Sequence, residues 1–215
     1  MTLRILSYNI LAGGENRLPL IANVIQQQQP DVVALQEARS RSNAEALAHQ
    51  LSMSFTFGEA HNTNKDHVVW LSHLPVIHTE NHPLPILAQA ILKLLQAHQN
   101  QSQVLAGDFN TIHPIDHPNI SAYVEVLKAR GEETPIPQFP RRVIPLLLEA
   151  GYVDCYRALH PFTPEDTSYT SHQALRVDYI FASSRLAERL SACDITRERD
   201  AQSASDHFPI WAEFS

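Results

Sequence analysis

The stretch LAGDFNT, residues 105–111, places an aspartate and an asparagine two positions apart at the end of an apolar run. Residues i and i+2 of an extended chain point to the same side, so Asp108 and Asn110 should project into one small volume. A carboxylate and an amide that converge at the end of a buried strand are poor core material. The pair therefore indicates a functional site.

Polar residues also interrupt the ends of the other apolar runs. They are Asn9, the Gln36-Glu37 pair, Asp178 and the Asp206-His207 pair. This set is rich in carboxylates and amides and holds one histidine, which suits the hard cations Mg²⁺ or Mn²⁺. A zinc site would more often show several histidines or cysteines at ligand spacing.

Carboxylates, amides, a histidine and a bound cation are the groups that phosphoryl transfer requires. A cation neutralises charge on a phosphate oxygen, and a histidine and an amide stabilise the charge that develops in the transition state. An aspartate can position or deprotonate the attacking water. Taken singly, Asn9 is typical of a turn, Glu37 of a solvated charge and Asp206 of a turn cap. Asp108 and Asn110 carry more weight, because they follow a buried run and a glycine.

Strands and helices alternate along the chain and must bring these residues together. Strands are predicted over 3–10, 32–38, 66–72, 103–110, 175–183, 192–198 and 207–214. Helices are predicted over 17–29, 42–51, 84–98, 119–130, 141–150 and 184–190, with a proline-rich loop over 132–140. No repeat or linker separates them, so we predict one α/β domain over residues 1–215, with two sheets and helices outside.

Composition narrows the function classes. The 215 residues carry a formal charge of −7, from 16 basic and 23 acidic side chains, which argues against a protein that grips nucleic acid mainly through a broad basic surface. The two cysteines, Cys155 and Cys193, form no disulfide framework and are expected to be reduced. No signal-peptide pattern and no membrane-spanning run is evident, so a cytoplasmic location is expected.

Six segments together resemble one known family. They are ILSYNI, VVALQE, LSHLPVI, LAGDFN, RVDYIFAS and SDHFPIWAEF. In this order they are similar to the endonuclease/exonuclease/phosphatase superfamily of metal-dependent phosphodiesterases, which includes abasic-site endonucleases, deoxyribonucleases, sphingomyelinases and inositol-polyphosphate phosphatases. The resemblance implies a four-layer α/β/β/α sandwich of two mostly antiparallel sheets flanked by helices, with the site along one edge.

The resemblance also implies a role for each polar residue. Glu37 would be the main ligand of Mg²⁺ or Mn²⁺, with Asn9 beside it and Asp206 near the metal. Asp108 would handle the nucleophilic water or the leaving-group proton, and Asn110 would stabilise the transition state.

The remaining roles concern the phosphate. The resemblance implies that Asp178 holds His207 in its working orientation, and that His207 contacts the scissile phosphate. Arg176 is a further candidate for binding the phosphate of the substrate.

One departure from the family pattern lies between LSHLPVI and LAGDFN. Family members usually carry another strand pair there, ending in a histidine that contacts the phosphate, so a strand pair is expected to be absent between residues 88 and 89. Three explanations stay open: a true deletion, a segment missing from the sequence, or substitution by another histidine. Five histidines are close enough in sequence to consider: His61, His67, His73, His78 and His82. We favour a missing segment, since removal of central strands would uncover sheet edges. We place His73 outside the site.

Two functions follow. The first is a metal-dependent hydrolase of phosphate esters, most readily a phosphodiesterase acting on nucleic acid, a lipid headgroup or a small diester. The second is a catalytically impaired binding module that keeps the fold. The absent histidine favours the second, and retention of the seven other polar site residues favours the first.

Overall fold

The computed structural model describes residues 2–60, 62–81, 88–116, 125, 128–129, 131, 141–163 and 166–215. Six strands form its larger sheet, in the order β3-β4-β2-β1-β9-β8. Their bounds are Leu3–Asn9 for β1, Val32–Gln36 for β2, Ser54–Gly58 for β3, Val68–Ser72 for β4, Leu190–Ile195 for β8 and Ile210–Phe214 for β9. Strands β1 and β2 are parallel and the other neighbours are antiparallel. A parallel pair needs a crossover, which helix α1, Leu18–Gln28, supplies after the short 3-10 turn η1, Glu15–Arg17.

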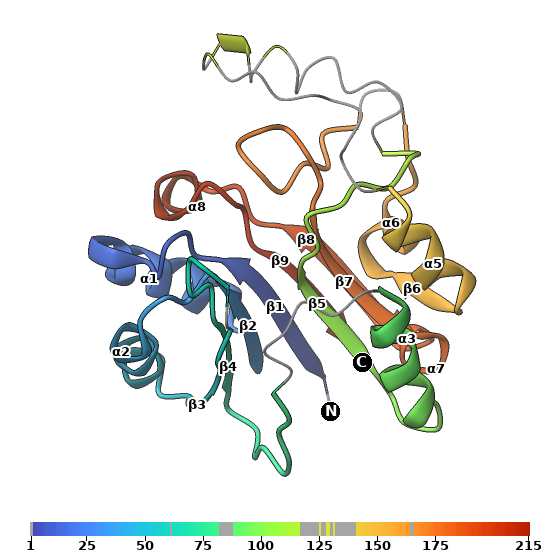
Figure 1. Cartoon of the computed structure of the whole chain (residues 1–215), viewed down its shortest axis with the longest axis horizontal. Helices are drawn as coiled ribbons and strands as arrows, with labels where there is room; N and C mark the ends of the chain where they lie inside the picture. The colour runs from blue at the N-terminus through green and yellow to red at the C-terminus, as the bar shows by residue number, and fades with distance from the viewer. Residues whose placement is uncertain are drawn as a thin grey trace.

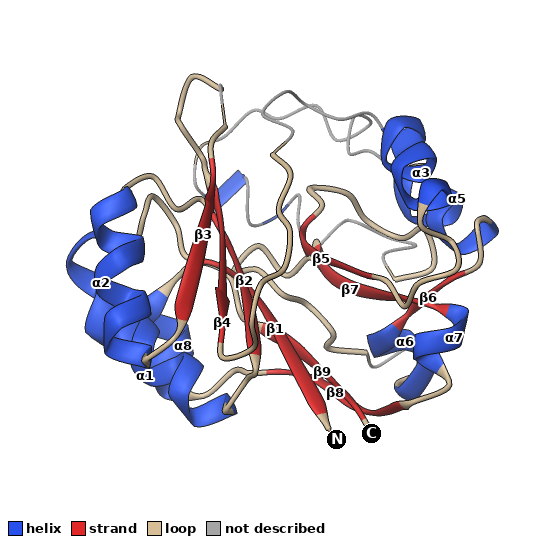
Figure 2. Ribbon diagram, turned by 90° about the horizontal axis from the view of Figure 1, so that it is seen from below, coloured by secondary structure: helices blue, strands red, loops and turns tan. Residues whose placement is uncertain are grey.

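The second sheet contains three described strands in the order β5-β7-β6, all antiparallel. They are Val104–Asp108 for β5, Tyr152–Asp154 for β6 and Asp178–Ser183 for β7. The sheets face each other and helices lie outside them (Figures 1 and 2). Helices α1, α2 (Arg41–Leu51) and α8 (Arg199–Ala204) lie beside the larger sheet, and α3 (Ala88–Ala97), α5 (Val143–Glu149), α6 (Cys155–Leu159) and α7 (Ser184–Ala187) lie beside the smaller one. The predicted α/β/β/α layers are confirmed.

Strand β7 shows why the sheets hold their positions. Tyr179, Ile180, Phe181 and Ala182 are each 0% exposed, because one face of the strand packs on the first sheet and the other on helices. A strand covered on both faces has a continuous apolar sequence rather than an alternating one. The rings of Tyr179 and Phe181 also meet the ring of Phe109 edge to face. This packing fixes the strand end that carries Asp178.

Most predicted elements are confirmed, with boundaries shifted by a few residues. Five short elements were not predicted: η1, β3, β6, α6 and α8. The predicted loop over 132–140 and residues 84–87 of a predicted helix lie outside the described residues, as does most of the predicted helix over 119–130. Between β4 and β5 the described residues hold α3 and no strand, in agreement with the expected absence of a strand pair. Among the described helices, none is both long and apolar enough to span a bilayer.

A two-glycine turn after β1 positions the first part of the site. Gly13 and Gly14 have φ angles of 78° and 74°, in the left-handed region that glycine adopts most easily. This conformation lets the backbone N–H of Gly13 donate to the carbonyl oxygen of Glu37 at 2.7 Å. A Cβ on Gly14 would lie 2.8 Å from Ile21 Cδ1 and 2.9 Å from Leu18 Cδ2. Glycine at position 14 therefore lets the turn pack directly against the core, where a larger residue would clash.

We predict that Gly14→Ala destabilises the protein more than Gly151→Ala. Both positions are left-handed, at φ 74° and 89°, but a Cβ on Gly151 meets nothing within 4 Å. Gly151→Ala should cost roughly 1–2 kcal/mol from backbone strain alone. Gly14→Ala should cost roughly 1–3 kcal/mol more, because its methyl overpacks the core. Urea unfolding of both variants measures the difference; equal losses would contradict the steric account.

Candidate active site

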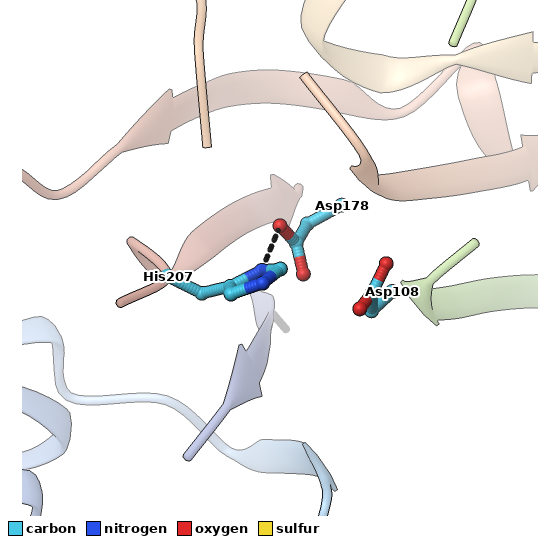
Figure 3. A group of neighbouring side chains, drawn as sticks. All are labelled: Asp108, Asp178 and His207. Atoms are coloured by element: carbon cyan, nitrogen blue, oxygen red, sulfur yellow. Dashed lines mark hydrogen bonds and ion pairs between the residues drawn. The ribbon is translucent and has the colours of Figure 1, made fainter. Parts of the chain in front are cut away.

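Strand ends from both sheets meet at one edge of the sandwich. Asn9 ends β1, Glu37 follows β2 and Asp108 ends β5, while Asp178 begins β7. His207 lies between α8 and β9, where it forms an isolated β-bridge with Ser171. Figure 3 shows Asp108, Asp178 and His207 turned toward one another. Residues from five separate segments thus converge, as the sequence predicted.

The amide of Asn9 connects the two sheets. Its Nδ2 donates to Glu37 Oε1 and to Asp108 Oδ2, both at 3.1 Å. Its Oδ1 accepts from the backbone N–H of Leu11 at 3.0 Å, which fixes the amide plane. Asn9 is 1% exposed, so these bonds are shielded from water. The side chain orients one carboxylate from each sheet.

Glu37 is held by the loop that follows β1. Its Oε2 accepts from the backbone N–H of Ala12 at 3.1 Å, and its backbone adopts φ 56°. Leu11 and Ala12, at φ 49° and 53°, share this unusual region. Left-handed non-glycine residues are strained and concentrate at functional sites. Three of them around one carboxylate indicate a position that the fold maintains for function.

Asp108 and Asn110 contact each other, as the opening motif suggested. Asp108 Oδ1 accepts from the backbone N–H of Asn110 at 2.8 Å, and Oδ2 accepts from Asn110 Nδ2 at 3.2 Å. Burial, and then the nearby Asp178 carboxylate, raise the pKa of Asp108 to about 6, although His207 and the hydrogen bonds from the Asn110 backbone and the Asn9 side chain oppose the shift. A carboxyl that titrates near neutrality can both accept and return a proton.

Asp178 and His207 form a buried ion pair. Asp178 Oδ2 lies 2.8 Å from His207 Nδ1, and Asp178 is 1% exposed. Burial alone would lower the pKa of His207, but the carboxylate of Asp178 outweighs it and raises that pKa to about 9. The imidazole is therefore charged at neutral pH, with Nδ1–H engaged by Asp178 and Nε2–H left to donate.

Two hydroxyl residues that the sequence did not single out position this pair. Ser205 Oγ donates to the backbone oxygen of Asn9 at 2.7 Å and accepts from the backbone N–H of His207 at 3.3 Å. Thr170 Oγ1 accepts from the backbone N–H of Asp178 at 3.0 Å. Ser205 adjoins the SDH motif and could have been found from it, whereas nothing in the sequence marks Thr170.

The donor set fits a divalent cation. One ligand atom each of Asp108, Asp178 and His207 lie within 4.8 Å of one another. Asp178 Oδ1 is buried without a hydrogen-bond partner, although buried carboxylate oxygens normally have one. A cation would supply the missing partner and offset the crowded negative charge. Since His207 is protonated, the carboxylates are the available ligands.

Arg176 does not lie where a phosphate could reach it. Its guanidinium is 0% exposed and pairs with Asp116 Oδ2 and Asp154 Oδ2, each at 2.6 Å. It also lies 4.3 Å from the ring centroid of Tyr179. These contacts tie the loop after Asn110 to the start of α6. The geometry therefore supports a positioning role and not the expected contact with substrate.

The structure also places several of the histidines considered from the sequence, and Asp206. The backbone N–H of His73 donates to the carbonyl oxygen of Asp31 at 2.9 Å, at the opposite end of β2 from Glu37, so His73 lies outside the site as expected. The carbonyl oxygen of His67 accepts from Ala38 N at 2.9 Å, which places this histidine at the Glu37 end. His61 and His82 lie outside the described residues. Asp206 adjoins His207, and its proposed place near the metal stays a prediction.

The family model described as Endonuclease/Exonuclease/phosphatase matches residues 6–207. The chain belongs to this family. Exodeoxyribonuclease III of Haemophilus influenzae is 35% identical over 77 residues, which cover 32% of this chain and 29% of that protein. The match thus spans less than a third of the curated relative.

Solved structures resemble the chain over nearly its whole length. An AP endonuclease from Archaeoglobus fulgidus has a TM-score of 0.68 at 22% identity, covering 99% of both chains. The 3′ phosphatase NExo from Neisseria, bound to a product DNA hairpin, has a TM-score of 0.71 at 20% identity, also covering 99% of both. At these identities the likeness establishes the shared fold.

We predict that Asp178→Asn lowers the pKa of His207 well below about 9, because burial still lowers it while the charge and hydrogen bond of Asp178 are lost; the carboxylates of Asp108 and Asp206 keep part of the rise. Nuclear magnetic resonance titration of the imidazole in EDTA measures this directly. Because the pKa of His207 is higher in the folded than in the unfolded protein, its protonation also stabilises the fold. This contribution to the free energy of unfolding is complete below pH 6.5 and is lost as the pH rises through about 9. An unchanged His207 pKa in the variant would contradict the ion-pair account.

Proposed function

We propose that this protein is a metal-dependent phosphoesterase that hydrolyses phosphodiesters with Mg²⁺ or Mn²⁺. The observation that carries the proposal is the cluster of Asp108, Asp178 and His207. Its imidazole is charged, its Asp108 carboxyl has a pKa of about 6, and Asp178 Oδ1 is buried without a hydrogen-bond partner. Family membership supports it. The names of the relatives, an exodeoxyribonuclease, an AP endonuclease and a 3′ phosphatase, support it further.

The residues divide the work. His207 donates from Nε2 to a phosphate oxygen, since Nδ1 is held by Asp178 at 2.8 Å. Asn110 is exposed, and its amide can donate to the same phosphate as charge develops. Asp108 moves the proton, either from the attacking water or to the leaving group, because its pKa of about 6 suits both directions.

Glu37 and Asp178 are the carboxylates that would hold the cation, with Asp206 as a further candidate and Asn9 beside Glu37, while Asp108 is left for proton transfer. When bound, the cation would act as a Lewis acid toward a phosphate oxygen. Asn9 presents N–H to both Glu37 and Asp108 in this structure, so it orients both carboxylates. Its own ligation through oxygen stays a prediction.

The substrate class is narrowed by charge and by the relatives. The net charge of −7 disfavours a broad grip on duplex DNA, yet the Neisseria relative is described with a DNA hairpin product. A terminal nucleotide or a small diester fits both facts better than a long duplex. Lipid headgroups remain a further class to test.

Both cysteines are free and buried, which supports the proposed cytoplasmic location.

We predict that the purified protein hydrolyses bis(p-nitrophenyl) phosphate with Mg²⁺ or Mn²⁺ and loses this activity in EDTA. Asp108→Ala should lower kcat roughly 10²–10⁴-fold, as expected for loss of a group that transfers a proton. Glu45→Ala, an exposed acidic position on α2, should leave kcat unchanged.

A folded protein that turns over no ester with any divalent cation would instead support the impaired binding module. Circular dichroism of each variant separates lost folding from lost chemistry. Activity that persists in EDTA would contradict the metal requirement.

A further inference from the structure

A single arginine joins two loops that carry different parts of the active site. Arg17 ends the 3-10 turn η1, directly before α1. Its Nη2 donates to the carbonyl oxygens of Leu11 at 2.5 Å and Ile10 at 3.3 Å, in the loop after β1. Its Nη1 donates to the carbonyl oxygen of Ala204, the last residue of α8. Helices α1 and α8 lie side by side, so one side chain reaches both loops (Figures 1 and 2).

The loop after β1 holds Asn9 and Glu37 through its backbone. The N–H of Leu11 donates to Asn9 Oδ1 at 3.0 Å, and the N–H of Ala12 donates to Glu37 Oε2 at 3.1 Å. Leu11 and Ala12 are left-handed, at φ 49° and 53°. Strained backbone of this kind persists only where the surrounding contacts over-determine it. The hydrogen bond from Arg17 to the Leu11 oxygen is one of those contacts.

The second loop leads from α8 to His207. Ala204 is followed by Ser205, whose Oγ donates to the backbone oxygen of Asn9 at 2.7 Å and accepts from the backbone N–H of His207 at 3.3 Å. The carbonyl group of Ala204 and the nitrogen of Ser205 belong to one planar peptide unit. By holding that carbonyl group, Arg17 fixes the peptide plane from which the segment to His207 starts.

The guanidinium group suits a bridge between two loops. It is planar, it stays charged, and its five N–H donors point in fixed directions. The three acceptors of Arg17 are backbone carbonyl oxygens, of which the Leu11 oxygen lies 6 positions away in the sequence and the Ala204 oxygen 187. A lysine would keep the charge, but its single nitrogen cannot reproduce a fork that reaches both loops. Arg17→Lys therefore separates geometry from charge.

We propose that Arg17 is a positioning residue of the active site, which locks the Glu37-holding loop, residues 10–13, to the His207 loop, residues 204–207. It thereby sets the distance between the Glu37 carboxylate and the imidazole. Its effect on turnover rests on the proposed function, whereas the locking does not. The three hydrogen bonds of Arg17 end on backbone oxygens and not on reacting groups. Its loss should therefore misplace groups that act in the transition state and lower kcat more than it changes KM.

The locking is tested first, in EDTA and without substrate, by amide hydrogen exchange followed by nuclear magnetic resonance. Arg17→Lys should speed exchange of the Leu11 and Ala12 amide protons roughly tenfold or more, because the loop opens locally. Exchange in β7 should not change. Arg199→Lys, at an exposed position of α8, is the matched control and should alter neither segment.

The effect on the reaction is tested second, with bis(p-nitrophenyl) phosphate and saturating Mn²⁺. Arg17→Lys and Arg17→Ala should each lower kcat roughly 10- to 100-fold and change KM by less than about twofold, whereas Arg199→Lys should change neither constant. Guanidinium chloride below its denaturing concentration should restore part of the kcat of Arg17→Ala, since the free ion can donate to the same carbonyl oxygens. Sodium chloride should not restore it, and guanidinium should not restore Asp108→Ala.

Wild-type exchange at Leu11 and Ala12 in Arg17→Lys would overturn the proposal. Faster exchange that includes β7 would also overturn it, since Arg17 would then serve general stability. Loss of kcat in Arg17→Ala that sodium chloride restores as well as guanidinium does would contradict the role of the fork. Faster exchange confined to the loop, in a protein without turnover, would refute the proposed hydrolysis and leave the locking role standing.

Discussion

The site depends on the crowding of carboxylates at one sheet edge. Asp108 and Asp178 lie directly opposite each other on β5 and β7, so their side chains share one face. Glu37 from the other sheet is joined to Asp108 through the amide of Asn9. One imidazolium, His207, offsets part of this charge and keeps a pKa of about 9 as a result. Burial, and then the negative charge of Asp178, raise the pKa of Asp108, and the uncompensated charge of the carboxylates favours binding of a cation.

Crowded charge can persist only where the surroundings are rigid. The buried strand β7 supplies this rigidity on one side, with Arg176 fixed between Asp116 on a loop and Asp154 at the end of β6. The two-glycine turn supplies it on the other side, by holding the backbone of Glu37. Both devices lie outside the reacting groups, yet each fixes the direction of a carboxylate. Arg176 therefore belongs to the site as a support.

The sequence predicted the layers and the convergence of the polar residues, because both follow from local rules. Apolar runs with a glycine or a polar end predict strands, and i, i+2 spacing brought Asp108 and Asn110 together. It did not predict the short elements β3 and α8, whose few residues give weak periodicity. The sequence also led us to expect Arg176 at the substrate, which is wrong. Its partners Asp116 and Asp154 lie 60 and 22 positions away, so no local pattern shows that Arg176 is buried. The support from Thr170 is missed although it lies only eight positions before Asp178, because no motif marks a lone threonine in that segment.

The central claim is that the crowded carboxylates form one cation site, and Mn²⁺ binding followed by electron paramagnetic resonance tests it most directly. The wild-type protein should bind Mn²⁺ saturably, and Glu37→Gln and Asp178→Asn should each weaken binding, roughly ten- to a hundredfold or more. Binding should tighten as the pH rises through about 6, where Asp108 loses its proton. A folded wild-type protein that binds no Mn²⁺, or binds it equally well after both substitutions, would contradict the account.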